Sequence, residues 1–283
     1  MSRIINIPAQ ENIISFAAGH IVKTGGVTAV VSGGKRPFLF LKQALFERLK
    51  KPFLPPEFFT GETLVDGILN GQAYLRISDI SAAYIIFEIA KNEAPILLNG
   101  RKSFAQFLPW AFEILSFIEQ LDLENASEER LKNLKANADI GYEAPENINE
   151  LLRNIFQIRK SFHRVCQEAN SITKGMAYLK ASKWQMQDFV GKFDEIILLA
   201  PFYLCASEFE IYKKIYDFGK LTIITQGSPQ EYGQLSKIYE YFGHKQPFCG
   251  AQEARQDLQI FNAYDGQSQG LLLKNLLANL KDE

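Results

Sequence analysis

The sequence has few of the residues that mark a disulfide-stabilised or metal-binding protein. It contains 3 cysteines and 3 histidines in 283 residues, and they lie far apart. Cys166, Cys205 and Cys249 form neither a CxxC pair nor an even set, and no HExxH motif occurs. We therefore expect no disulfide framework and no metal site, which is typical of a protein of the reducing cytoplasm.

The sequence also lacks a strong net charge and a long apolar run. Its 31 basic and 32 acidic residues give a formal charge of −1. This balance excludes a uniformly basic nucleic-acid-binding coat but not a local basic patch, because net charge does not describe how charges are distributed. The charge-free apolar stretch at 196–207 is about half of the ~20 residues that a membrane-spanning helix needs, and the first residues lack the apolar core of a signal peptide. We expect no membrane partner and a cytoplasmic location.

Standard nucleotide-binding and hydrolase motifs are absent as well. The sequence contains no GxxxxGK[ST] loop, no GxGxxG loop and no GxSxG elbow. A P-loop ATPase, a dinucleotide-binding enzyme of the usual kind and an α/β-hydrolase are therefore excluded as simple interpretations.

What the sequence does contain is an α/β pattern at both ends. Short apolar runs alternate with amphipathic segments, which is typical of a parallel sheet covered by helices. Strands are expected at 3–8, 27–31, 193–200, 221–225 and 258–263, and helices at 11–23, 37–50, 60–69, 207–218, 230–242 and 267–280. The β-branched run VTAVV predicts a strand buried on both faces, and Ser207 is the expected N-cap of its helix.

The middle of the chain differs, because from 76 to 187 only helical periodicity is visible. Helices are expected at 80–90, 104–121 and, as one long element, at 147–182; the polar segment 124–143 is expected to be an exposed helix plus loop. We therefore predict an α/β domain of residues 1–75 and 186–283, interrupted by an all-helical insertion of residues 76–185.

The segment Ser32-Gly33-Gly34-Lys35-Arg36 is the first candidate site. It follows a predicted buried strand and precedes a helix, so its backbone N–H groups and two cations suit a phosphate group. A solvated strand-to-helix turn explains the same residues equally well. A third interpretation is an adenylating enzyme, since SGG after a strand resembles the start of the SGGxDS loop; here Arg36 and Pro37 replace the Asp and Ser.

Several polar and aromatic residues and one cysteine are interpreted as structural and not functional. Asp194 and Glu195 are expected to be solvated at the start of a strand, the wrong end for ligands to nucleotide-bound Mg²⁺. Trp110 and Trp184 are expected to pack in a core or between domains, and Cys205 to be a small apolar filler.

The order of these segments resembles the N-terminal part of the B subunit of AddAB helicase–nucleases, whose first domain is a degenerate superfamily 1 helicase domain. The resemblance is carried by INIPAQENIISFAAGHI, VTAVVSGGKRPFLFLKQAL, FLPPEFFTGETLVDGIL and FDEIILLAPFYLCASEFEIYKKIYDFGKLTIITQGSPQ. It covers most of the chain in order and is weakest in the helical insertion. It implies a P-loop-NTPase-like helicase 1A domain with a 1B-like helical insertion.

The resemblance also implies a loss of ATP hydrolysis, because three motif positions lack the residues that bind phosphate and Mg²⁺ in active helicases. The Walker A position at 8–14 has no Gly-Lys-Ser/Thr, and the Walker B position reads Ala200-Pro201-Phe202-Tyr203-Leu204, without acids. The next motif reads Gln226-Gly227-Ser228-Pro229-Gln230 and lacks its Asp. No catalytic residue, cofactor or metal is implied for this chain.

By the same resemblance, the expected ligand is DNA, as single strands or duplex ends. The contacts implied are Ser32, Lys35 and Arg36, with Thr60 behind them. An AddA-like helicase–nuclease subunit is the implied partner, and a PD-(D/E)XK nuclease domain, often with an iron–sulfur cluster, is implied downstream in a longer protein. A protein-interaction scaffold that binds no DNA remains the alternative.

Overall fold

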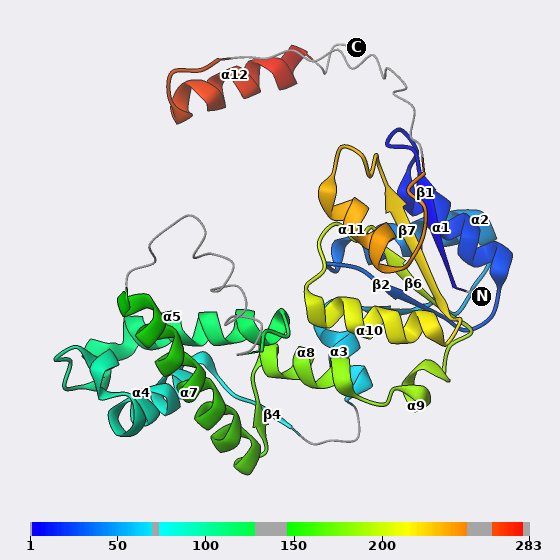
Figure 1. Ribbon diagram of the computed structural model, residues 1–283. Helices are drawn as coiled ribbons and strands as arrows, with labels where there is room; N and C mark the ends of the chain where they lie inside the picture. Colours follow the sequence, from blue (N-terminus) through cyan, green and yellow to red (C-terminus); the bar gives the residue numbers. More distant parts are fainter. Residues whose placement is uncertain (1, 70–73, 128–145, 248–261, 280–283) are drawn as a thin grey trace. The chain divides into compact units, whose positions relative to one another are not determined.

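The computed structural model describes residues 2–69, 74–127, 146–247 and 262–279 (Figure 1). The chain divides into two compact units, Met1–Cys249 and Gly250–Glu283. The second unit contributes one described helix, α12 (Gly266–Asn279). The predicted segment 124–143 and the predicted strand 258–263 lie largely outside the described residues.

The first unit is built on a five-stranded, entirely parallel sheet with the order β1-β7-β6-β2-β3. The strands are β1 (Arg3–Ile7), β2 (Thr28–Val31), β3 (Glu57–Phe59), β6 (Glu195–Leu199) and β7 (Leu221–Gln226). All four residues of β2 are buried, which confirms the predicted burial on both faces. The α/β class and the parallel sheet are thus confirmed.

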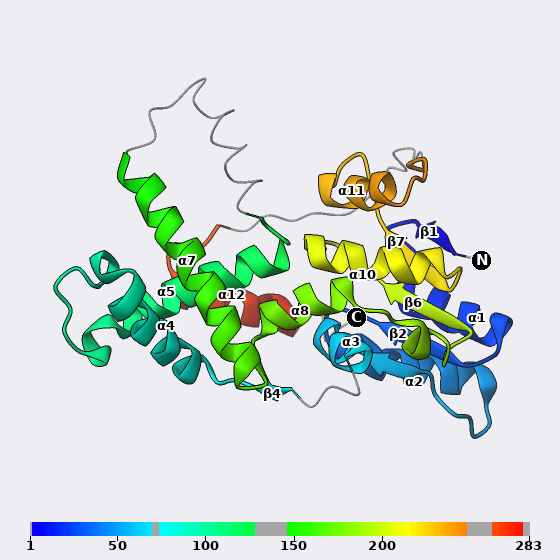
Figure 2. The same ribbon diagram turned by 60° about the horizontal axis from the view of Figure 1, so that its bottom comes forward.

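Helices cover both faces of this sheet (Figures 1 and 2). α1 (Ile13–Thr24) and α2 (Arg36–Leu49) pack on one face, where Leu41 and Leu45 meet Val30 and Ile197. The opposite face is covered by α3 (Gly61–Ile68), α8 (Lys174–Lys183), α9 (Gln187–Val190), α10 (Ala206–Asp217) and α11 (Gly233–Tyr241). Each face therefore buries its own apolar cluster, as expected for a parallel sheet.

The predicted helical region is also present, with a core of its own around Ile86, Phe107, Ile158 and Phe162. Its elements are β4 (Leu75–Arg76), α4 (Asp79–Glu93), the 3₁₀ helix η1 (Pro95–Leu98), α5 (Phe104–Leu123), α7 (Glu146–Glu168) and β5 (Ser171–Ile172). Among the described residues, no helix is long and apolar enough to cross a membrane.

Two details of the helical region were predicted wrongly. The region is not purely helical, because β4 and β5 form a short parallel pair in which Leu75 N–H donates to Asn170 O. The single helix expected at 147–182 ends at Glu168. Asn170 adopts a left-handed conformation with φ 48°, and Thr173 starts α8 by accepting a hydrogen bond from Met176 N–H. As a result, α8 packs on the sheet's core.

Two side-chain predictions also need correction. Cys205, not Ser207, is the N-cap of α10; the Ser207 hydroxyl is buried and donates to Asp122 O at 3.0 Å. Trp110 is 45% exposed, with the Arg101 guanidinium 5.2 Å from its ring centroid. Trp184, by contrast, packs against the sheet's core as expected.

Candidate nucleic-acid interface

The segments of interest follow the strands at one edge of the sheet. Because all five strands are parallel, their carboxyl ends line the same edge. In open parallel sheets this edge is where ligands bind. The predicted turn after β2 and the segment after β3 are neighbours there, since β2 pairs with β3.

A surface hollow of about 340 Å³ lies at this edge between α2 and the start of α3. We call it the lysine hollow; its lining residues are Lys35, Phe38, Leu39, Lys42, Phe58, Thr60 and Thr63. It brings together Lys35 and Thr60, two predicted site residues from different segments. The structure adds Lys42, which the sequence analysis missed. Its spacing, two helical turns after Lys35, is the signal that could have found it.

The two aromatic rings that line the lysine hollow, Phe38 and Phe58, are packed against each other. Their ring centroids are 4.9 Å apart, and the Lys42 ammonium lies 5.2 Å from the Phe58 centroid. The polar groups that the hollow offers are therefore ammonium and hydroxyl groups on an apolar wall. Such a surface suits a phosphate backbone better than a nucleobase.

The other predicted contacts have different environments. Ser32 is only 6% exposed, and its N–H donates to Phe59 O at 3.1 Å, so it joins β2 to β3 below the surface. Arg36 is exposed at the first residue of α2 but does not line the hollow. Thr60 caps α3, because its Oγ1 accepts from Thr63 N–H at 3.3 Å while its own N–H donates to Thr63 Oγ1 at 2.8 Å.

Two residues at the start of α2 offer no free backbone donor to a phosphate. Lys35 is the N-cap and makes no side-chain cap hydrogen bond. Pro37 has no N–H, and Phe38 N–H donates to Lys35 O at 3.2 Å. Backbone donors for an anion must therefore come from the residues before Pro37, together with the side chains of Lys35 and its neighbours.

The segment that follows β1 is closed by a side chain. Gln226 Nε2, at the end of β7, donates to Pro8 O and Ala9 O at 3.2 Å each and to Glu11 O at 2.6 Å. The loop thus turns carbonyl oxygens toward the amide. A phosphate-binding loop needs the opposite, N–H groups that converge on the ligand.

The segment after β6 holds aromatic side chains and an acidic cap. Tyr203 is 58% exposed, and its hydroxyl donates to Glu124 Oε1 at 2.7 Å. Glu124 Oε2 accepts from Ala206 N–H at 3.3 Å, so a carboxylate from the end of α5 lies at the N-terminus of α10.

Burial raises the pKa of Glu208 in the first turn of α10. Burial and the nearby Glu208 charge raise the pKa of Cys205 to about 12, which fits the predicted filler and not a nucleophile.

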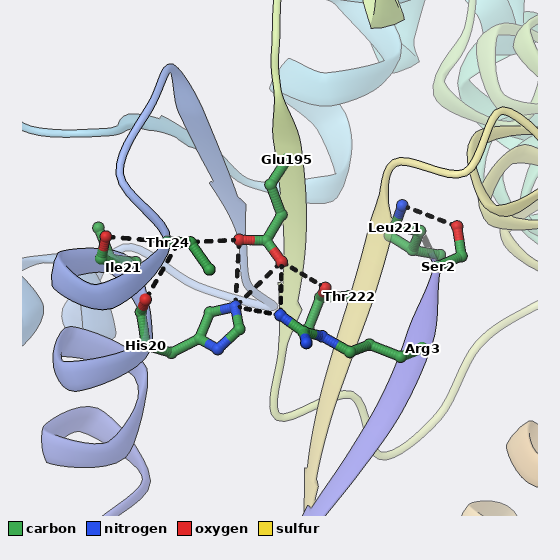
Figure 3. Close-up of polar contacts among 8 residues, drawn as sticks. All are labelled: Ser2, Arg3, His20, Ile21, Thr24, Glu195, Leu221 and Thr222. Carbon is green, nitrogen blue, oxygen red and sulfur yellow. Dashed lines mark hydrogen bonds and ion pairs between the residues drawn. The ribbon is translucent and has the colours of Figure 1, made fainter.

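Of the two carboxylates at the start of β6, Asp194 is exposed, as predicted, whereas Glu195 is largely enclosed by neighbouring side chains, contrary to the prediction (Figure 3). Glu195 lies 3.0 and 3.1 Å from His20 Nε2 through its two oxygens and accepts a hydrogen bond from Thr222 Oγ1. Arg3 Nη2 is 3.6 Å from Glu195 Oε1. The neighbouring Asp194 accepts from Val27 N–H at 2.8 Å. Both carboxylates therefore hold elements together at the amino edge, away from the lysine hollow.

The pKa of Glu195 reflects this environment. Burial by itself would raise it, but the hydrogen bonds from His20 and Thr222 and the nearby positive charges lower it below its ordinary value. Within the described part of the chain, no group of three or more His, Cys, Asp or Glu side chains could hold a metal ion.

The chain matches no protein-family model, and no curated protein is significantly similar to it in sequence.

Proposed function

We propose that this chain is a helicase-like module that has lost ATP hydrolysis and binds single-stranded DNA through the lysine hollow. Its place would be in an AddB-like protein of double-strand-break repair, beside an AddA-like subunit. The proposal rests on the sequence resemblance together with the geometry of the carboxyl edge of the sheet.

The observation that carries the proposal is the position of the motif segments. The resemblance assigns helicase motif positions to the segments after β1, β2, β6 and β7. All four strands belong to one parallel sheet, so these segments share one edge. A helicase-like domain requires this arrangement, because its nucleotide and DNA contacts are made from that edge.

The loss of ATP hydrolysis is supported by the side chains found in the segments after β1 and β6. Gln226 closes the loop after β1, where an ATPase would hold the phosphates. The segment after β6 carries Phe202 and Tyr203, which are 55% and 58% exposed, in place of Mg²⁺-binding acids. Neither segment offers the charge stabilisation that phosphoryl transfer needs.

DNA binding is supported by the local charge around the hollow. Residues 35–57 include six basic and two acidic side chains, a net charge of +4 in a chain whose formal charge is −1. Lys35 and Lys42 both line the hollow. Contacts of this kind release counterions from the DNA and are largely independent of base sequence.

The test is fluorescence anisotropy of a labelled oligothymidine at several salt concentrations, with the variant Lys35→Ala/Lys42→Ala. We expect salt-sensitive binding that the double variant weakens, with a log–log salt slope reduced by about 0.7 for each lysine–phosphate pair that the variant removes. Lys192→Ala is the matched control, because Lys192 is exposed just before β6, at the opposite edge of the sheet. An unchanged salt slope in the double variant would contradict the assignment.

The same titration with Mg-ATP separates the adenylating alternative. We expect no ATP binding, since Arg36 and Pro37 stand where the SGGxDS loop has its Asp and Ser. Tight Mg-ATP binding that disappears in Lys35→Ala would instead favour an adenylating enzyme.

A further inference from the structure

Helix α2 has one side that its own fold does not cover. The sheet covers Phe38, Leu41 and Leu45. The neighbouring α1 lies along a second side, where Arg48 Nη2 donates to Ser15 O at 3.0 Å and to Ser15 Oγ at 2.9 Å. On the remaining side, large apolar side chains reach the surface.

The exposed side is an ordered row. Leu39 is 67% exposed and Phe46 is 60% exposed. Leu39, Lys42 and Phe46 are spaced by three and four residues, so they lie on one face of the helix. We call this row the α2 flank. The sheet ends at β3 beneath it, so the flank borders the place where another helix of the same layer could lie.

Three lysines border the α2 flank. Lys35 stands at its start, Lys42 in its middle and Lys50 at its end. The one acid within α2, Glu47, accepts a hydrogen bond from Gln43. An apolar row bordered by cations complements an apolar row bordered by carboxylates.

We infer that the α2 flank docks an amphipathic helix of a protein partner, with an apolar face bordered by Asp or Glu. A helix fits because residues at this spacing interdigitate with the ridges of a second helix. An added strand fits poorly, since the edge strand β3 has three residues and follows Pro55 and Pro56. Nucleic acid fits less well than protein, because only one of the two apolar side chains of the flank, Phe46, offers a ring on which a base could stack.

This interface is distinct from the proposed DNA site but overlaps it. Leu39 and Lys42 belong both to the α2 flank and to the lysine hollow. The acidic helix and single-stranded DNA must therefore compete for the protein. Phe46 belongs to the flank alone, which gives the experiment a residue that separates the two ligands.

The test uses a labelled synthetic helical peptide of about 18 residues, long enough to form a helix, with a leucine face bordered by glutamates. A matched peptide carries lysines in place of the glutamates. We expect the glutamate peptide to bind the whole chain and the lysine peptide to bind at least about tenfold more weakly, because like charges repel. Leu39→Ser/Phe46→Ser should weaken glutamate-peptide binding by about tenfold, because two apolar side chains no longer bury their surface against the peptide. Unlabelled oligothymidine should displace the glutamate peptide.

Ile80→Ser is the control for exposed apolar side chains, because Ile80 is 62% exposed on α4, and it should leave peptide binding unchanged. Equal binding of the two peptides, or binding that the flank variant does not reduce, would overturn the inference. So would a loss of oligothymidine binding in Phe46→Ser, because the lysines remain and the flank would then belong to nucleic acid. Peptide binding without any DNA binding would overturn only the proposed function.

Discussion

Gln226 Nε2 donates to Glu11 O at 2.6 Å, and this contact closes the loop that follows the first strand. The same amide also reaches Pro8 O and Ala9 O at 3.2 Å each. One side chain at the end of β7 therefore organises the loop in which a helicase ATPase would hold its nucleotide. Under the proposed function, the contact would join the loss of ATP hydrolysis to the stability of the fold.

Gln226→Ala should destabilise the protein without creating ATP binding. Three carbonyl groups would no longer share a donor, and we expect the free energy of unfolding to fall by about 1–2 kcal/mol. Urea unfolding measures this change, and calorimetry with Mg-ATP should still show no binding. Gln43→Ala is the control, since its bond to Glu47 lies within one helix and joins no distant segments, so its removal should change stability by less than about 0.5 kcal/mol.

Glu195 should make stability depend on pH in the acid range. Its pKa is lowered from the ordinary value of 4.5, because the hydrogen bonds from His20 and Thr222 outweigh the effect of burial. A lowered pKa stabilises the fold above pH 4.5 and the contribution is lost as the pH falls below that value. We expect Glu195→Gln to reduce the slope of stability against pH in this range and to cost about 2 kcal/mol at neutral pH. Denaturant unfolding at pH 3 to 7 measures both effects; an unchanged slope would contradict the assignment.

Asp122 should be a main determinant of the helical region. Its side chain is fully buried, with Arg159 Nη2 at 2.6 Å and His163 Nε2 at 2.9 Å. Asp122→Ala leaves a largely buried guanidinium without its partner, and we expect a cost of about 3 kcal/mol. Hydrogen exchange should accelerate first in α5 and α7. The exposed pair Lys213–Asp217, at 2.6 Å, is the control, and Asp217→Ala should cost less than about 1 kcal/mol.

Gly67 should tolerate no side chain, although it lies within a helix. A Cβ built there would lie 2.7 Å from Phe189 Cε2, inside the apolar cluster against which α3 packs. We expect Gly67→Ala to lower the free energy of unfolding by about 1–3 kcal/mol through overpacking. At Gly233, the first residue of α11, no atom lies within 4 Å of such a Cβ. Gly233→Ala should therefore be neutral or stabilise the protein by up to about 1 kcal/mol. Thermal unfolding of both variants separates overpacking at Gly67 from the general effect of replacing glycine by alanine.

Several features could be predicted from local patterns alone. The run VTAVV predicted a buried strand, and Thr60 preceded a helix as expected, because its hydroxyl and that of Thr63 form a cap within four residues. The break of the long central helix was missed, because a left-handed Asn170 and a Thr173 cap give no clear signal within a helical periodicity. The exposure of Trp110 was missed because composition does not tell an inward from an outward ring.

The candidate site was predictable only in part. Lys35 and Thr60 stood in the right segments because both follow strands, and parallel strands end at one edge. Lys42 was missed, since its role depends on the hollow formed where α2 meets β3 and α3. Glu195 was placed in solvent for the same kind of reason, because its partners His20 and Thr222 are far from it in sequence.

The sequence by itself therefore determined four strands of the parallel sheet (β1, β2, β6 and β7), most helices and the absence of standard ATPase motifs, because these depend on side-chain periodicity and on residues adjacent in the chain. Only the tertiary structure decided which carboxylates are paired, that Gln226 closes the first loop, and that one side of α2 stays uncovered. Those features depend on contacts between residues up to about two hundred positions apart. Such contacts form only when the whole sheet packs, because no local preference brings distant segments together.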